Sequence, residues 1–180
     1  AEWVNFGGGH HITRDDYDTE LLIELIKNFK KNYNVEVFLE PGEAIGWKTG
    51  FLLARVEDLV EANNEKTVVM NVSFTCHMPD CLEMPYKPAL RGESEAKKPK
   101  HVYTFGGPTC LSGDFIKGFG FDKPVKKGDT LIFEDMLHYT FVKTTMFNGV
   151  NHPAIGILKK NGKFKLVRKF GYSDYKGRMS

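Results

Sequence analysis

The sequence predicts an α/β segment followed by an all-β region, and two observations support this fold class. Up to about residue 45, a strand, an amphipathic helix and a second strand follow one another with short connections, as in a parallel β/α unit. Beyond that residue, helical periodicity gives way to short apolar runs separated by Gly, Pro, Asn and Asp. Such runs are typical of an antiparallel sandwich or barrel. We therefore expect two domains, residues 1–45 and 46–180.

Three consecutive elements predict the first domain. An apolar strand over residues 3–6 runs into a triple glycine at 7–9, and a second strand over 35–39 ends in Glu40-Pro41-Gly42. Between them, apolar residues recur at three- and four-residue spacings over 16–33, which predicts a helix. Its acidic first turn and basic last turn suit the helix dipole. The apolar positions are Leu22, Leu25, Ile26, Phe29 and Tyr33.

The second domain is predicted from runs rich in β-branched and aromatic residues. Long loops are expected around 85–88 and 94–100, where proline and charged residues gather. The predicted strands cover residues 51–60, 67–74, 102–105, 130–133, 139–145 and 164–170.

Composition excludes several classes of partner. The chain has 180 residues and a net charge of +2, and no basic stripe with interleaved aromatics, so nucleic-acid binding is not expected. No apolar run approaches the roughly 20 residues of a membrane span. Three cysteines without a regular framework favour free thiols and a cytoplasmic location. Cys76-His77 with Cys81 lacks the paired spacing of a structural zinc site, so no metal is predicted.

Chemistry is suggested first by Cys110, which follows Gly106-Gly107-Pro108-Thr109 and precedes Asp114. A thiol on a constrained, partly exposed turn next to a carboxylate suits proton transfer. The alternative is a tight loop in which a small cysteine packs against its neighbours.

Two features of the first domain suggest anion binding. The triple glycine at 7–9 lets a ligand approach the backbone, and successive amides there form a cradle for phosphate. It lacks the P-loop lysine and the dinucleotide spacing, so ATP and NAD are disfavoured. Glu40 closes the second strand, where barrel enzymes keep their chemistry. The alternative for the triple glycine is a flexible turn, and the alternative for Glu40 is an exposed glutamate that ends the strand. Tyr139 lies on a predicted strand, where its alternative is packing in the core.

Four motifs occur in a defined order: Gly-Gly-Gly-His-His at 7–11, Glu-Pro-Gly-Glu-Ala at 40–44, Cys-His-Met-Pro-Asp at 76–80 and Gly-Gly-Pro-Thr-Cys at 106–110. Together they resemble the C-terminal part of the alanine-racemase-fold, pyridoxal-phosphate-dependent decarboxylases, which include the ornithine and diaminopimelate enzymes. The resemblance is strongest to the carboxynorspermidine/carboxyspermidine decarboxylase branch and extends over essentially all 180 residues.

The resemblance implies the last βα units of a TIM-like barrel, a C-terminal β-barrel or sandwich domain, and pyridoxal 5′-phosphate as cofactor. Its implied reaction converts carboxynorspermidine or carboxyspermidine to norspermidine or spermidine in polyamine biosynthesis. Cys110 would return a proton to the substrate carbon, and Glu40 would face the pyridine nitrogen. The implied cofactor-binding residues are Gly7, Gly8, Gly9, Glu40, Gly42 and Tyr139. The implied substrate-binding residues are Asp80, Asp114 and Glu43.

Two positions depart from the wider family and agree with this branch. Glu43 stands where ornithine-type enzymes carry a phosphate-clamping arginine, and Leu111 replaces an acidic residue after the cysteine. The family's Schiff-base lysine matches no residue of this sequence, so a preceding N-terminal barrel segment is expected and the chain alone should be inactive. The family also implies a homodimer with shared active sites. Open alternatives are another decarboxylase or racemase of this fold, or a non-catalytic regulatory homologue.

Overall fold

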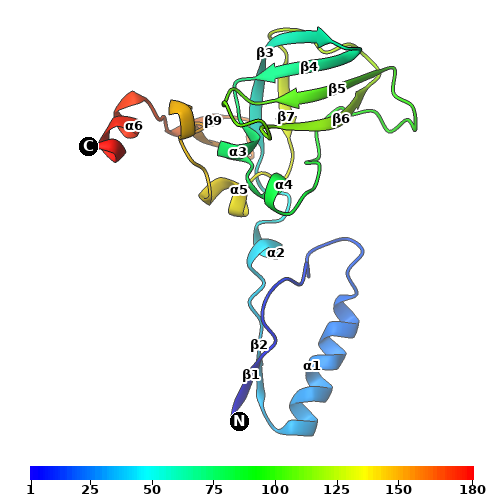
Figure 1. The fold of residues 1–180 in the computed structure, drawn as a ribbon. Coiled ribbons are helices and arrows are strands. Elements are labelled where there is room, and N and C mark those ends of the chain that lie inside the picture. Colours follow the sequence, from blue (N-terminus) through cyan, green and yellow to red (C-terminus); the bar gives the residue numbers. More distant parts are fainter. The chain divides into compact units, whose positions relative to one another are not determined.

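A computed structural model describes residues 1–180 of the chain. The chain divides into two compact units, Ala1–Gly50 and Phe51–Ser180, called here the N-terminal unit and the C-terminal unit (Figure 1). The composition of the sequence changes near residue 45, whereas the structural division follows Gly50. Each unit is described by itself.

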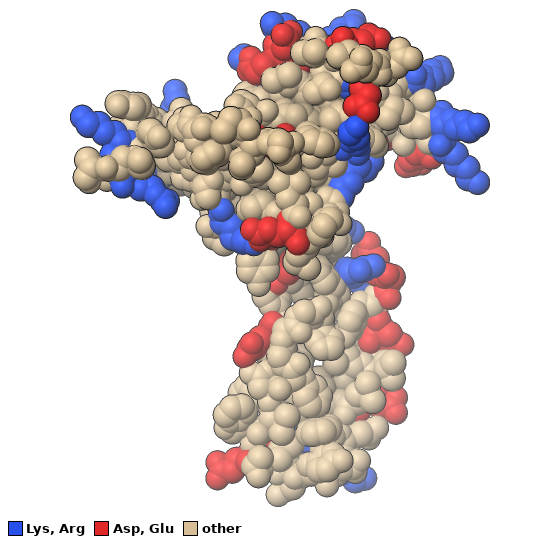
Figure 2. All heavy atoms as spheres, in the orientation of Figure 1, with Lys and Arg blue, Asp and Glu red and all other residues tan.

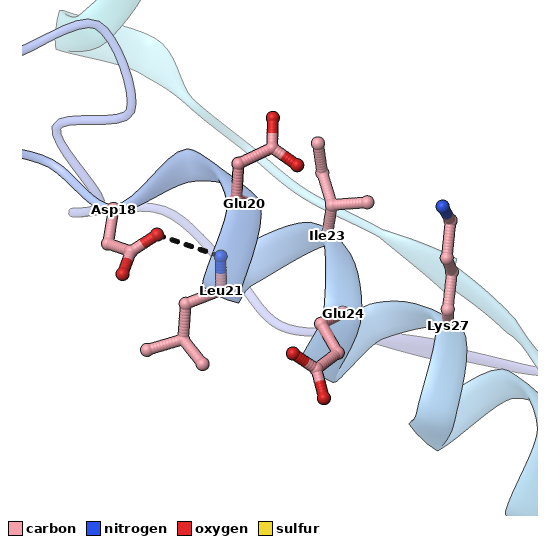
Figure 3. Close-up of a pocket in the computed structure, with 6 residues that line it drawn as sticks. All are labelled: Asp18, Glu20, Leu21, Ile23, Glu24 and Lys27. Atoms are coloured by element: carbon pink, nitrogen blue, oxygen red, sulfur yellow. Dashed lines mark hydrogen bonds between the residues drawn. The ribbon is translucent and has the colours of Figure 1, made fainter.

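The N-terminal unit has the predicted order of strand, helix and strand. Its two strands pair in parallel, with Trp3 opposite Glu36. The helix begins at Thr19 rather than at residue 16, because Asp18 caps it by accepting a 2.9 Å hydrogen bond from the Leu21 amide (Figure 3). The elements are β1 (Trp3–Asn5), α1 (Thr19–Tyr33), β2 (Glu36–Phe38) and α2 (Gly42–Gly46).

The apolar stripe of α1 is only partly covered within this unit. Phe29 packs edge-on against Phe6 with ring centroids 5.0 Å apart, but no residue of the helix is fully buried. Leu25 and Tyr33, two of the apolar positions that predicted the helix, keep 55% and 66% of their surface exposed. A two-stranded sheet is too small to cover an apolar helix face of this width.

The C-terminal unit is built around one mixed sheet in the order β6-β5-β4-β3-β7 (Figure 1). Four of its strands were predicted within a few residues, but β4 and β5 pair in parallel, so the sheet is not wholly antiparallel. A separate hairpin joins β8 and β9. The strands are β3 (Leu52–Ala62), β4 (Glu65–Met70), β5 (His101–Gly106), β6 (Phe115–Phe121), β7 (Thr130–Phe133), β8 (Ile155–Leu158) and β9 (Phe164–Arg168).

Short helices connect these strands or follow the last of them. The predicted strand over 139–145 is wrong: α5 occupies most of it, with an unstructured segment after it. Phe74, placed at the end of a predicted strand, instead opens α3 behind the capping residue Ser73. The helices are α3 (Phe74–His77), α4 (Asp80–Glu83), α5 (His138–Val142), the 3₁₀ turn η1 (Phe147–Gly149) and α6 (Tyr172–Met179).

Aromatic side chains form the core of the C-terminal unit. Phe105 stacks on Phe119 at 4.5 Å and meets Phe133 edge-on, and all three are fully buried. Stacked and edge-on pairs of this kind stabilise a core beyond their area burial. The sheet therefore gives a rigid base to the loop between β5 and β6, which carries Cys110.

Candidate active site

The backbone conformation or the surroundings of each residue in the triple glycine explain why glycine stands there. Gly7 and Gly9 adopt φ values of +76° and +82°, a region that favours glycine, and a side-chain carbon at either would meet no atom within 4 Å. A side chain on Gly8 would overlap the carbonyl oxygen of Glu40. The turn is thus shaped by its glycines and leaves open space beside its backbone.

Two amides that the sequence assigned to phosphate already have partners within the protein. The Gly7 N–H donates to Asn5 Oδ1 at 2.7 Å, and the Gly42 N–H donates to the Glu40 carbonyl at 2.8 Å. These two amides therefore already have acceptors within the chain. The Gly8 and Gly9 amides have no acceptor in the chain.

Glu40 follows β2, and its carboxylate is oriented by a neighbouring strand end. Asn5 Nδ2 donates to Glu40 Oε1 at 2.6 Å, while the residue remains exposed. Asn5 was not predicted as a site residue. Its position could have been found from the parallel pairing, because β1 and β2 end side by side and bring Asn5 opposite Phe38, two residues before Glu40.

A surface depression of about 290 Å³ adjoins the triple glycine, lined by Gly9, His10, His11, Arg14, Asp16 and Tyr17. Arg14 supplies a cation there and forms a two-pronged ion pair with Asp16, with N–O distances of 2.9 and 2.7 Å. This pairing lowers the pKa of the Asp16 carboxyl below its usual value. His11 Nε2 lies 3.1 Å from a carboxylate oxygen of Glu43, so Glu43 already has a partner in its own unit.

A second depression, of about 430 Å³, lies along the exposed surface of α1 (Figure 3). Charged side chains and the exposed Leu21 and Ile23 line it. It includes none of the predicted site residues.

In the C-terminal unit, Cys110 is the exposed thiol. Cys76 and Cys81 are buried, and all three are free. Burial raises the pKa of the Cys81 thiol to about 11, so that thiol stays protonated at neutral pH. Cys110 is therefore the thiol with access to a ligand.

Asp114, predicted to bind substrate amines, is buried among donors of its own chain. Its Oδ1 accepts from Ser73 Oγ at 3.0 Å and from the Thr75 amide at 3.1 Å. Its Oδ2 accepts two hydrogen bonds from Thr109, one from the backbone amide at 3.2 Å and one from the Oγ1 hydroxyl at 2.6 Å. Only 4% of the residue is exposed. With two donors on each oxygen, this carboxylate is committed to holding the loop.

Cys110 has a second support that the sequence reasoning missed. Its backbone N–H donates to Asn148 Oδ1 at 2.9 Å. Asn148 lies in η1, 38 residues further along the chain. Asn148 is the middle residue of a Phe-Asn-Gly turn at 147–149, and its contact with Cys110 depends on the tertiary fold.

Tyr139 and Asp80 lie on short helices of the same unit. Tyr139, on α5, is 57% exposed and not part of the core. Asp80, on α4, accepts from Lys143 Nζ at 2.5 Å, and Lys143 also contacts Glu83. These hydrogen bonds raise the pKa of the Lys143 ammonium. The Lys143 ammonium therefore already contacts the carboxylates of both Asp80 and Glu83.

Basic and acidic side chains are interspersed on the face drawn in Figure 2, without a continuous basic stripe. No helix combines the length and apolar character needed to cross a lipid bilayer.

The family model described as "Pyridoxal-dependent decarboxylase, C-terminal sheet domain" matches residues 17–136. The mixed sheet and its exposed cysteine loop thus belong to a decarboxylase domain, and the chain is a member of this pyridoxal-dependent family.

Particular relatives narrow the comparison. The chain is 52% identical over 179 residues to the carboxyaminopropylagmatine decarboxylase of Synechocystis sp., covering 99% of this chain and 46% of that protein. It is 43% identical to the carboxynorspermidine/carboxyspermidine decarboxylase of Campylobacter jejuni, covering 97% and 48%. The chain spans about half the length of these relatives.

Solved structures agree with this assignment. Carboxynorspermidine decarboxylase from Campylobacter jejuni, in complex with norspermidine, matches with a TM-score of 0.88 and 42% identity, covering 98% of this chain and 51% of that one. Diaminopimelate decarboxylase from M. jannaschii matches with a TM-score of 0.76 and 25% identity, covering 98% and 42%.

Proposed function

We propose that the whole protein is a pyridoxal-phosphate-dependent decarboxylase that removes CO₂ from a carboxylated polyamine in polyamine biosynthesis. The observation that carries the proposal is the single exposed thiol, Cys110, on a loop held by its own chain. This loop occurs in a chain 43–52% identical to decarboxylases named for such substrates.

The residues of the N-terminal unit fit this cofactor. Gly7 and Gly9 leave open space beside the backbone, and the amides of Gly8 and Gly9 are available to a phosphate. Arg14, beside Gly9 in the depression, is the candidate cation for the phosphate in place of the arginine that Glu43 replaces, and it would exchange its ion pair with Asp16 for the phosphate. We propose that Tyr139 adds a hydroxyl donor. The unit itself would be the last β/α part of a TIM-like barrel.

Glu40 would hold the pyridine nitrogen in its protonated form. When bound, the cofactor supplies a ring that accepts the electron pair released as CO₂ leaves. A carboxylate stabilises the positive charge on the ring nitrogen, and Asn5 fixes that carboxylate through Oε1. Oε2 of Glu40 is left to face the nitrogen.

Cys110 would act as the general acid. After CO₂ departs, the electron pair of the broken bond returns to the substrate carbon, and the Cys110 S–H bond breaks to give that carbon a proton. The resulting thiolate takes a proton from water, which restores the thiol. The residue's exposure permits both transfers.

Asp80 and Glu83 form the acidic pair that we propose for the substrate's cationic tail. Charge-assisted hydrogen bonds to carboxylates suit an ammonium group, and Lys143 marks the position where such a group is held. Glu43 is a further candidate. Asp114 is removed from this role because its oxygens are saturated within the chain.

A second substrate is favoured by the 52% identity to a carboxyaminopropylagmatine decarboxylase. Agmatine ends in a guanidinium, whereas norspermidine ends in an ammonium. A planar guanidinium can bind carboxylates in two-pronged fashion, and two adjacent carboxylates on α4 would suit either cation.

No lysine of this chain matches the family's Schiff-base lysine, so we propose that it lies in the rest of the protein. We also propose a homodimer in which the Cys110 loop serves the partner's site, and a cytoplasmic location consistent with three free thiols.

Purified complete protein should be tested with carboxynorspermidine, carboxyspermidine, carboxyaminopropylagmatine, diaminopimelate and ornithine, following CO₂ release and the amine product. We expect turnover of at least one carboxylated polyamine and an absorbance band from the covalently bound cofactor. Turnover of only diaminopimelate or ornithine would reassign the substrate. A protein that binds no cofactor and turns over none of the five would be the regulatory homologue.

A further inference from the structure

We propose that Asp114 and Asn148 are positioning residues that together hold the backbone of Cys110 and so determine where its sulfur lies. The inference rests on the proposed role of Cys110 as proton donor. It assigns a function to the buried carboxylate and to the Phe-Asn-Gly turn, which the cofactor and substrate contacts leave unexplained.

Asp114 holds the residue before the cysteine. Thr109 donates both its backbone N–H and its hydroxyl to Asp114 Oδ2, at 3.2 and 2.6 Å. Hydrogen bonds to a charged acceptor are stronger than neutral ones. Burial also shields this carboxylate from competing water. Thr109, the residue before Cys110, is therefore fixed through its amide and its hydroxyl by a buried carboxylate whose oxygens each accept two hydrogen bonds.

Asn148 holds the next amide along the chain. Its Oδ1 accepts the Cys110 N–H at 2.9 Å, and its own backbone has φ 57° and ψ 18°. Asparagine tolerates this left-handed conformation better than most residues with a side chain. Asparagine thus meets two requirements at this position, the backbone conformation and the acceptor for Cys110.

The two supports share one anchor, the short helix α3. The Thr75 amide donates to Asp114, while the neighbouring Cys76 thiol contacts the Phe147 carbonyl at 3.7 Å. Phe147 precedes the asparagine that binds Cys110. The support of Thr109 and the support of the Cys110 amide are therefore tied to the same short helix, although Asp114 and Asn148 come from loops far apart in sequence.

A fixed backbone limits the sulfur of an exposed cysteine to its side-chain rotamers. Proton transfer requires the acid within hydrogen-bond reach of the carbon, and a misplacement of about 1 Å can reduce the rate by a factor of about 100. Exposure of the thiol and immobilisation of its main chain thus serve different needs of the same step.

The test compares two substitutions at one position in the complete protein. Asn148→Gly keeps the left-handed backbone but removes the acceptor, whereas Asn148→Asp keeps both. Asn161→Gly is the matched control, because Asn161 Oδ1 accepts the Lys163 amide in the turn between β8 and β9. Thr109→Val removes one hydroxyl donor from Asp114 and probes the other support without deleting the buried carboxylate.

Hydrogen exchange of the peptide spanning 106–115 gives a readout independent of activity. For Asn148→Gly we expect exchange at the Cys110 amide to become about tenfold faster. We also expect kcat to fall by about 10- to 100-fold with KM and cofactor affinity unchanged. Asn148→Asp should retain slow exchange and most of kcat. Thr109→Val should show a smaller loss of exchange protection and of kcat than Asn148→Gly. Asn161→Gly should match the unsubstituted protein in both quantities.

Faster exchange at Cys110 with unchanged kcat would overturn the positioning role, as would equal effects of Asn148→Gly and Asn161→Gly. If the unsubstituted protein decarboxylates no carboxylated polyamine, the proposed function fails instead. The exchange measurement then still decides whether Asp114 and Asn148 hold the loop, so the two failures are distinguishable.

Discussion

The carboxyl group of Asp114 lies directly against the backbone of Gly107. A side-chain carbon at position 107 would be 2.6 Å from the Asp114 carboxyl carbon, which is well inside van der Waals contact. The carboxylate cannot swing away without losing hydrogen bonds from Ser73, Thr75 and Thr109. Glycine is therefore required at position 107 because the Asp114 carboxyl group occupies the space that a side chain would need.

Gly107→Ala should destabilise the C-terminal unit by about 1–3 kcal/mol, because the added methyl group overpacks a buried, hydrogen-bonded site. Urea-induced unfolding followed by circular dichroism measures the change. Gly113→Ala is the matched control in the same loop, since a side-chain carbon there meets no atom within 4 Å and its φ is not in the left-handed region. Equal stabilities of the two variants would contradict the packing between Gly107 and Asp114.

Local sequence patterns predicted most of the elements but not all of their types. Periodicity and short connections gave the parallel pair of β1 and β2, and the predicted strand over 130–133 coincides with β7. The run at 139–142 contains a tyrosine, a threonine, a phenylalanine and a valine, which favour a strand, yet it forms α5. Short apolar runs do not distinguish strand from helix. Strands β6 and β8 were missed, and β6 carries Gly118 and Gly120, which weakened its signal.

The candidate site was predictable where a residue's role depends on its own exposure. Cys110 is exposed, as expected for its turn, whereas the exposure of Glu40 is also what the alternative of a strand-terminating glutamate predicts. The commitment of Asp114 was not predictable, because it follows from donors at Ser73 and Thr75, about 40 residues earlier in the chain. The contact of Asn148 with Cys110 likewise requires the tertiary fold.

His77 should make stability depend on pH between 6.5 and 4. Burial, reinforced by His152, lowers its pKa from 6.5 to about 4, and the buried Nδ1 accepts the Ser73 amide. Because the folded-state pKa is depressed, this stability is fully present above pH 6.5 and is lost as the pH falls toward 4. The loss from this group is about 3 kcal/mol.

Urea unfolding at pH 7 and pH 4.5 measures this dependence. His77→Asn is the informative variant, because its Oδ1 can still accept the Ser73 amide but does not titrate. We expect a smaller loss of stability on acidification than in the unsubstituted protein. His152, whose pKa burial also lowers, remains in both proteins and cancels in the comparison. An unchanged pH dependence would show that His77 does not carry it.

Lys143→Met should lower KM for a carboxylated polyamine in the complete protein. Lys143 occupies Asp80 and Glu83, so its removal frees both carboxylates for the substrate's cation. An exposed ion pair contributes little, so we expect a change of about two- to fivefold, diminished by added salt. Lys117→Met, which removes the cation paired with Glu65 on the sheet, is the control. If KM is unchanged, the acidic pair does not bind substrate.

Substitution of Cys110 tests the proton donor directly. Cys110→Ala should lower kcat by about 10²- to 10⁴-fold, the range typical of a lost general acid. The kcat of Cys110→Ser should lie between those of the unsubstituted protein and the alanine variant, since a hydroxyl is a much weaker acid than a thiol. The alanine variant lacks the group that would protonate the carbon that lost CO₂, and protonation at another position would lead to release of an aldehyde in place of the amine. Product analysis should therefore detect that aldehyde.

A thiol-labelling measurement makes this interpretation specific to Cys110. Iodoacetamide should modify one cysteine of this chain in the native protein and none after Cys110→Ala, because Cys76 and Cys81 are buried. If labelling disappears while turnover and product remain unchanged, the loop holds an accessible thiol that takes no part in protonation. If labelling and the correct product are lost together while the cofactor stays bound, the proton that replaces CO₂ comes from this sulfur.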